Sequence, residues 1–281
     1  MKANTFIVGA PKAGTTSLHY YLSQHEDVCM STIKEPNYFS FEEVSSLFYN
    51  ATSVSDSKAY HKLFKEEKKI IGEASVSYLF YENIPNRILE YNPKANIIIM
   101  LRNPLDRAIS HYLMDYRLGF CSLSLEDILN NRHAYPLFFQ QYLELGLYYQ
   151  SVKRYLDTFG DEQVHILYYT NFKNDIKDLM KGVFQFLKIE NTSLDYSVQN
   201  SFLSSDYAFV SYLYRLSWVR KGLKSLIPQN YVKSVKNRLF SKTDKPNFSD
   251  SLLSQINAFY QSDISQLESL LNVDLSQWKK D

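Results

Sequence analysis

The sequence predicts an α/β fold with a central parallel sheet between two layers of helices and a helical C-terminal part. Strand and helix signals alternate over the first 110 residues, which is the pattern of a parallel sheet with crossover helices. The strand signal stops near residue 200, and only helical patterns follow. Hydrophobic residues make up 45% and charged residues 22% of the 281 residues, so the chain can bury a large core and intrinsic disorder is excluded.

The elements of the first 110 residues follow from local patterns. Thr5–Val8 is a short β-rich run, and a glycine-bounded loop separates it from a helix over about Thr15–Gln24. Lys69–Gly72 is a second candidate for a buried strand. Asn96–Leu101 reads Asn-Ile-Ile-Ile-Met-Leu, the strongest strand pattern in the chain. Pro104 suits the first turn of the helix that follows it.

The later elements continue this alternation and then turn helical. We expect a strand over Val164–Tyr169, with helices near Tyr148–Thr158 and Ile176–Leu187. Two further helices are expected over Tyr207–Leu226 and Ser249–Leu271, and prolines break the chain between them.

No internal repeat or low-complexity tract divides the chain, so we expect residues 1–281 to form a single domain. It would comprise an α/β core at 1–200 and a helical part at 201–281. The longest apolar run has five residues, against the ~20 that span a bilayer, and the N-terminus has no signal-peptide pattern. Cys29 and Cys121 form no CxxC pair, which predicts two free thiols in a reducing compartment. We therefore expect a cytoplasmic protein without a membrane span.

The loop between the first strand and the first helix predicts a phosphate site. It reads Gly9-Ala10-Pro11-Lys12-Ala13-Gly14-Thr15-Thr16-Ser17. Such a loop gathers unpaired backbone N–H groups, the helix dipole and hydroxyl donors at one anion-sized spot. The alternative is an ordinary strand–turn–helix whose glycines only relieve the backbone. The nucleotide-triphosphatase loop carries its lysine directly after the second glycine, where this chain has Thr15. Lys12 lies inside the loop instead, which predicts contact with a shorter anion, near the bond between a 5′-phosphate and its leaving group.

A second phosphate site is predicted after the Asn96–Leu101 strand. Arg102 follows the carboxyl end of this strand, where open α/β sheets bind ligands. Ser110 lies eight residues further on, two turns into a helix, so both side chains can face one crevice. An arginine fork with a hydroxyl suits a phosphate, although Arg102 or Arg107 could instead pair with Asp106. Together the two sites imply a ligand with two separated phosphates.

These two motifs resemble those of the sulfotransferases that use 3′-phosphoadenosine 5′-phosphosulfate (PAPS). The likeness is strongest to the carbohydrate branch, which includes heparan sulfate sulfotransferases and bacterial relatives. It covers residues 4 to about 190 and, more loosely, the C-terminal helix up to Trp278. The resemblance implies a P-loop-containing three-layer fold whose 1–200 core binds the nucleotide. It implies contacts with the 5′-phosphosulfate from Lys12, Ala13, Gly14, Thr15, Thr16 and Ser17, and with the 3′-phosphate from Arg102 and Ser110.

The resemblance also implies two catalytic residues. Lys12 would neutralise charge on the departing 5′-phosphate. Glu35, in Lys34-Glu35-Pro36-Asn37-Tyr38-Phe39, takes the position of the family's glutamate base. Pro36 stops a helix from continuing there, so Glu35 is expected at a loop end facing the cleft. The alternative is a solvated glutamate beside Lys34.

The sequence departs from some family members near these residues. Asn37 stands where some heparan sulfate enzymes have a histidine, and Ala74 stands where some carry a lysine that meets an acidic glycan. Glu73 either assists at the acceptor or pairs with a buried partner. Of the histidines, His19 is expected to be packed or exposed, and His111 could approach the 3′-phosphate. No metal-ligand spacing appears, and we expect no metal.

Together these observations predict a PAPS-dependent sulfotransferase acting on a hydroxyl or amine of an acceptor, expected to be a glycan or glycolipid. Adenosine 3′,5′-bisphosphate would be the second product. The alternatives are a P-loop small-molecule kinase, a sulfotransferase for a small-molecule, lipid or phenolic acceptor, and a non-catalytic nucleotide-binding scaffold. The formal charge of +1 gives no bias toward nucleic acid.

A basic segment at 215–245 holds nine Lys or Arg residues and one acid. One interpretation is contact with an acidic acceptor or a membrane surface. Another, implied by the resemblance, is closure over the 3′-phosphate. Arg220-Lys221-Gly222 resembles the Arg-Lys-Gly of cytosolic sulfotransferases, and Lys242 and Lys245 precede the last helix much as the family's phosphate loop does. A third is an ordinary solvated basic face, and the sequence does not choose among them.

Overall fold

The computed structural model describes residues 1–47, 51, 53–196, 204–205, 240–241 and 247–279. The helix predicted over Tyr207–Leu226 lies outside the described residues. So does the basic segment at 215–245, apart from Phe240 and Ser241.

A five-stranded parallel sheet forms the centre of the molecule, in the order β2-β3-β1-β4-β5. Strands β1, β3 and β4 are almost wholly buried because helices cover both faces, and such strands are expected to be continuously apolar. The strands are β1 (Thr5–Gly9), β2 (Val28–Met30), β3 (Ile70–Ala74), β4 (Asn96–Leu101) and β5 (Val164–Tyr168).

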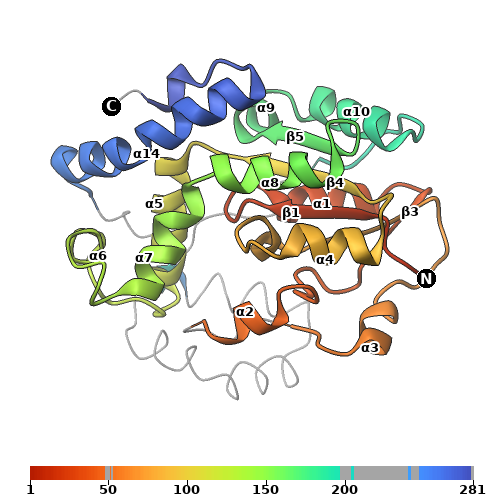
Figure 1. The fold of residues 1–281 in the computed structure, drawn as a ribbon, viewed down its shortest axis with the longest axis horizontal. Coiled ribbons are helices and arrows are strands. Elements are labelled where there is room, and N and C mark those ends of the chain that lie inside the picture. The colour runs from red at the N-terminus through yellow and green to blue at the C-terminus, as the bar shows by residue number, and fades with distance from the viewer. Residues whose placement is uncertain (48–50, 52, 197–203, 206–239, 242–246, 280–281) are drawn as a thin grey trace.

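Helices cover the two faces of the sheet, which confirms the predicted three-layer α/β fold. In Figure 1, α4 (Ile84–Tyr91) and α8 (Tyr149–Phe159) lie in front of the sheet and α1 (Thr15–Ser23) lies behind it. Helix α10 (Ile176–Leu187) packs on β5 and places Phe184 against His25, which follows α1, with 5.1 Å between the ring centroids.

Two long helices extend the core at one end. Helix α5 (Pro104–Arg117) follows β4, and the Asn103 side chain accepts hydrogen bonds from the first N–H groups of its first turn. Helix α14 (Asp250–Leu271), capped by Ser249, packs against α5 and α8. The shorter helices are α2 (Phe41–Ser45), α3 (Ser57–His61), α6 (Leu125–Asn130), α7 (Pro136–Tyr142) and α9 (Tyr169–Asn174), with 3₁₀ turns η1 (Val76–Leu79), η2 (Glu144–Gly146) and η3 (Ser276–Trp278).

The strands differ from the sequence prediction in three main respects. Strand β2 was not expected, because three residues are too few to show a pattern. Strand β3 runs two residues past Gly72, because buried hydroxyl groups accommodate Glu73 within it. The expectation of helices alone beyond residue 200 is wrong, because Ser204–Ser205 (β6) pairs antiparallel with Phe240–Ser241 (β7).

Candidate functional site

The carboxyl edge of the sheet gathers the loops that carry the predicted site residues. All five strands are parallel, so the segments after β1, β3 and β4 emerge at the same edge. Backbone hydrogen bonds tie them together. Ala10 N donates to Met100 O at 2.7 Å, and Glu35 N donates to Ala74 O at 2.8 Å. The structure therefore brings the 9–17 loop, the Glu35 loop and the start of α5 to one place.

The 9–17 loop has the form of an anion cradle. Gly14 has a φ of 95°, which residues other than glycine rarely adopt. A Cβ there would also lie 3.3 Å from the Tyr169 ring, so the position favours glycine for two reasons. Among the described residues, the backbone N–H groups of Gly14, Thr15 and Thr16 meet no hydrogen-bond acceptor. Unsatisfied N–H groups at the start of a helix are suited to bind an anion.

Lys12 points from this loop toward α5. Its Nζ lies 3.1 Å from Met114 Sδ, a weak acceptor. Burial and the nearby Arg117 guanidinium lower the Lys12 pKa to about 8, while the carboxylates of Asp115 and Glu35 oppose that shift. A half-buried cation without a strong acceptor gains from an incoming anion.

Arg102 and Ser110 retain unused hydrogen-bonding capacity. Arg102 Nη1 donates to Lys12 O at 3.0 Å, and its guanidinium lies 4.7 Å from the Tyr169 ring centroid. Its Nε is buried and has no partner within the described part of the chain. The predicted alternative, pairing with Asp106, is present only at 3.9 Å to an exposed carboxylate. The half-buried Ser110 hydroxyl makes no hydrogen bond to a described residue.

Glu35 lies on a loop, as predicted from Pro36. Its φ is 61°, and its side chain is 39% exposed. It forms an ion pair with Lys34, so the alternative predicted from the sequence, a solvated glutamate beside Lys34, is also present. Its carboxylate makes a small contribution that raises the pKa of Lys12, and the backbone hydrogen bond to Ala74 holds this loop at the same sheet edge as the loop lysine.

Glu73 is fully buried and bonded to hydroxyl groups. Its Oε1 accepts hydrogen bonds from Tyr60 and Tyr78, both at 2.9 Å, and its Oε2 accepts one from Ser75 at 2.7 Å. Burial raises its pKa to about 7 despite these hydrogen bonds. Of the two interpretations left open by the sequence, the structure supports the buried partnership, because at 0% exposure Glu73 offers no surface to an acceptor.

Sequence reasoning missed Asp115, which lies on α5 behind Lys12. It is 1% exposed, accepts a hydrogen bond from Tyr142 Oη at 3.0 Å and lies 3.9 Å from His111 Nε2. Burial raises its pKa to about 7, and Lys12 and the Tyr142 hydroxyl oppose that shift. Its i,i+4 spacing from His111 was the available signal.

The expectation that His111 approaches the 3′-phosphate is not supported. The ring is buried between Arg107 and Asp115, and burial holds its pKa well below the usual range. His19 is packed rather than exposed, and burial followed by the Lys34 charge lowers its pKa to about 4. Neither histidine is placed as an accessible base.

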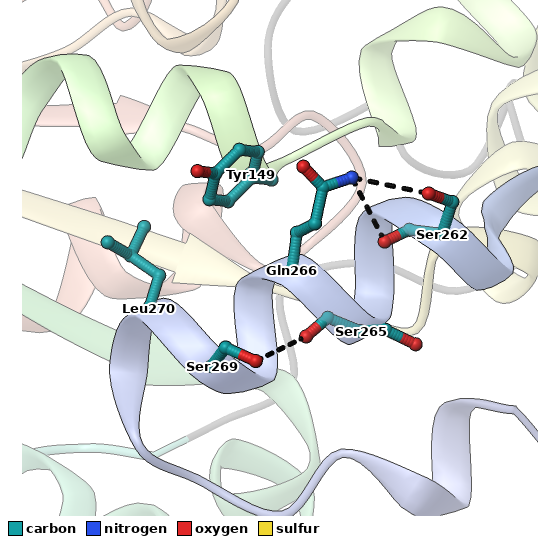
Figure 2. A pocket seen from close by; sticks show the side chains of 6 residues that line it. All are labelled: Tyr149, Ser262, Ser265, Gln266, Ser269 and Leu270. Atoms are coloured by element: carbon teal, nitrogen blue, oxygen red, sulfur yellow. Dashed lines mark hydrogen bonds between the residues drawn. The ribbon is translucent and has the colours of Figure 1, made fainter.

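Other parts of the described structure add no second site. A hollow of about 560 Å³ lies between Tyr149 and α14, and Figure 2 shows the six side chains that line it. The six labelled residues that line it include no acid or base, and Ser265, Gln266 and Ser269 hydrogen-bond within their own helix.

The described residues also hold no cluster of His, Cys, Asp or Glu side chains able to bind a metal ion. None of the helices that the structure describes is long and apolar enough to cross a membrane. Cys29 and Cys121 are buried free thiols, in agreement with the absence of a CxxC pair.

Comparison with known proteins places the chain among sulfotransferases. The family model described as "Sulfotransferase domain" matches residues 2–268. The crystal structure of a sulfotransferase from Alicyclobacillus acidocaldarius is 29% identical, with a TM-score of 0.75 over 100% of both chains. A mouse sulfotransferase complexed with PAP shares the fold at 16% identity, with a TM-score of 0.53 over 97% of this chain and 90% of that one.

Two curated relatives act on carbohydrates according to their names. Human carbohydrate sulfotransferase 15 is 28% identical over 250 residues, covering 66% of this chain and 43% of that protein. The Xenopus laevis bifunctional heparan sulfate N-deacetylase/N-sulfotransferase 1 is 26% identical over 203 residues, covering 68% of this chain and 22% of that protein. The chain therefore spans less than half the length of these relatives.

Proposed function

The chain belongs to the sulfotransferase domain family, and we propose that it transfers a sulfuryl group from PAPS to a hydroxyl of a glycan. One observation carries the proposal. An anion cradle with a half-buried lysine, an arginine whose buried Nε has no partner among the described residues, and an accessible carboxylate share one edge of the sheet.

The residues present fit a nucleotide with two separated phosphates. The N–H groups of Gly14, Thr15 and Thr16 suit the 5′-phosphosulfate, together with Lys12, Ala13 and the Ser17 hydroxyl. Arg102 Nε and the Ser110 hydroxyl suit the 3′-phosphate, because both lack a partner among the described residues. When bound, PAPS supplies an activated sulfuryl group.

The chain's own residues then perform alignment and charge stabilisation. The acceptor oxygen forms a bond to sulfur while the bond from sulfur to the 5′-phosphate oxygen breaks, and the electron pair stays on that phosphate. Lys12 stabilises this developing charge. Glu35 takes the acceptor's proton, which leaves a sulfate ester and adenosine 3′,5′-bisphosphate.

A carbohydrate acceptor is supported by the names of the relatives. Ala74 stands where some family members have a lysine for an acidic glycan. We therefore propose a sugar hydroxyl that does not need a neighbouring carboxylate for recognition.

A transfer assay with labelled PAPS and a panel of glycans tests this function. Glu35→Gln is expected to lower kcat by about 100-fold or more, because it removes the base, while the affinity for adenosine 3′,5′-bisphosphate stays close to wild type. Glu26→Gln, an exposed glutamate beyond α1, is the matched control and should retain full activity. Wild-type turnover in Glu35→Gln would show that the base is another residue.

A further inference from the structure

The loop that carries Glu35 has an unusual backbone. Glu35 and Asn37 have φ values of 61° and 48°, in the left-handed region that residues other than glycine seldom adopt. Two such residues one position apart need contacts that hold them. The direction of the Glu35 side chain depends on these backbone angles, so the contacts that fix them also set where its carboxylate lies.

Asn37 makes most of these contacts. Its backbone N donates to Ser75 Oγ at 3.0 Å, and its Nδ2 donates to Glu35 O at 3.1 Å. Its Oδ1 accepts a hydrogen bond from Ser77 Oγ at 2.7 Å. Because the Asn37 side chain is buried and both its amide nitrogen and its amide oxygen are hydrogen-bonded, it holds the loop in place. We call this set of contacts the Asn37 brace.

Ser75 links this brace to Glu73. A serine hydroxyl has one hydrogen to donate, and Ser75 donates it to Glu73 Oε2 at 2.7 Å. Its lone pairs are thereby directed at the Asn37 N–H. Glu73 is therefore joined to the Asn37 backbone through one serine hydroxyl, and the Asn37 side chain continues the connection to Glu35 O.

The other Glu73 oxygen reaches the far side of the same loop. Tyr78 donates to Oε1 at 2.9 Å, and its hydroxyl also accepts a hydrogen bond from Phe39 N at 3.2 Å. Tyr60 donates to the same oxygen and stacks on Tyr38, with 4.2 Å between the ring centroids. Glu73 thus hydrogen-bonds to three side chains that each contact the loop. Ser75 contacts Asn37. Tyr78 contacts Phe39, and Tyr60 contacts Tyr38.

We infer that Glu73 is a positioning residue, which holds the Glu35 loop in its left-handed conformation through Ser75 and Asn37 and so fixes where the Glu35 carboxylate lies at the site. This inference rests on the proposed function for the role of Glu35. A role limited to fold stability would be shared by other carboxyls that tie down a loop. Glu268, which is half-buried, is one, because it accepts a hydrogen bond from Leu275 N at 2.7 Å and pairs with Lys279 near the end of α14.

The first arm of the test is amide hydrogen exchange in the nucleotide-free protein, which does not depend on activity. Glu73→Gln and Ser75→Ala should each speed exchange in the 31–40 segment and leave the 9–17 loop unchanged. Ser75→Ala keeps the Glu73 carboxylate and breaks only the link, so it serves if Glu73→Gln fails to fold. Glu268→Gln is the matched control and should alter neither segment. Unchanged exchange in the 31–40 segment of both test variants would overturn the inference.

The second arm is a double-mutant cycle on turnover. Glu73→Gln should lower kcat roughly tenfold and leave KM for PAPS within about twofold. Added to Glu35→Gln, it should cause no further loss, because it acts through Glu35. An additive loss, or a loss equal to that of Glu268→Gln, contradicts positioning. If the wild type transfers no sulfuryl group, the proposed function fails, and the exchange arm still decides whether Glu73 holds the loop.

Discussion

Glu73 and Asp115 are two buried carboxyl groups that lie behind the two proposed catalytic side chains, yet their surroundings differ. Both are almost wholly buried, and burial raises the pKa of each to about 7. All three donors to Glu73 are neutral hydroxyls. Asp115 accepts one hydroxyl and also faces the Lys12 charge.

This difference indicates two separate tasks. Neutral hydroxyl donors fix a shape, because each hydrogen bond has a defined direction and persists as nearby charges change. A carboxyl near a half-buried lysine acts mainly on the lysine's pKa, because opposite charges that are partly shielded from water favour each other's ionised form. We therefore propose that Glu73 fixes the position of Glu35, whereas Asp115 helps to set the protonation of Lys12.

The largest effect is expected from removing the charge itself. Lys12→Ala should lower kcat about 100- to 1,000-fold, as loss of one preorganised charge stabiliser does elsewhere. The measurement is the transfer assay, with Lys65→Ala, an exposed lysine, as the control. Retention of more than about a tenth of wild-type turnover would remove Lys12 from the mechanism.

The next effect separates the two carboxyls. Asp115→Asn removes a group that raises the Lys12 pKa, so at pH 8 a smaller fraction of Lys12 is protonated. We expect the Kd for adenosine 3′,5′-bisphosphate to rise roughly threefold to tenfold. Glu73→Gln should leave that Kd unchanged. Equal effects of both substitutions on the Kd would break the distinction between shape and charge.

A smaller effect concerns protons taken up on binding. In the free protein the Lys12 pKa is about 8, and a bound phosphate should raise it. Between those two values, binding takes up protons, so at pH 8.5 the binding enthalpy should depend on the ionisation enthalpy of the buffer. Titrations in two buffers measure this, and Lys12→Met should abolish the difference. Identical enthalpies for the wild type in both buffers would mean that Lys12 does not meet the anion.

The smallest effect is on stability against pH. The folded pKa of Glu73 and Asp115 is about 7, against ordinary values of 4.5 and 3.8. Between the ordinary and the raised values the folded state therefore binds more protons than the unfolded state, so their contribution to stability falls as pH rises. Thermal unfolding measures this stability. Between pH 4.5 and 7.5 it should fall less steeply with pH in Glu73→Gln and in Asp115→Asn than in the wild type. A slope unchanged in both variants would show that these groups do not titrate in this range.

Local patterns predicted most of the sheet and its main helices. Strand β4 and helix α10 have the predicted bounds, because β4 is a continuous apolar run, α10 has a strong helical hydrophobic period, and both have clear ends. Strand β2 was missed because its three residues are strand only through pairing with β3.

The site was predicted unevenly for a similar reason. The 9–17 loop and Arg102 follow strands directly, so their place in the chain predicted their place in space. Glu35 came from a resemblance, since nothing local distinguishes it from a solvated glutamate. Asp115 has one local signal, its i,i+4 spacing from His111. Its other partner, Tyr142, and the Glu73 partner Tyr60 are distant in sequence, and such tertiary partners leave no local pattern.

The central claim is that this site binds a nucleotide with a 3′-phosphate and a 5′-phosphate. Calorimetric titration with adenosine 3′,5′-bisphosphate, compared with AMP and with ATP–Mg²⁺, tests it most directly. We predict tight binding of the bisphosphate, weaker binding of AMP because Arg102 and Ser110 then lack their anion, and loss of that preference in Arg102→Ala. Preference for ATP–Mg²⁺ over the bisphosphate would contradict the account and favour a kinase on the same fold.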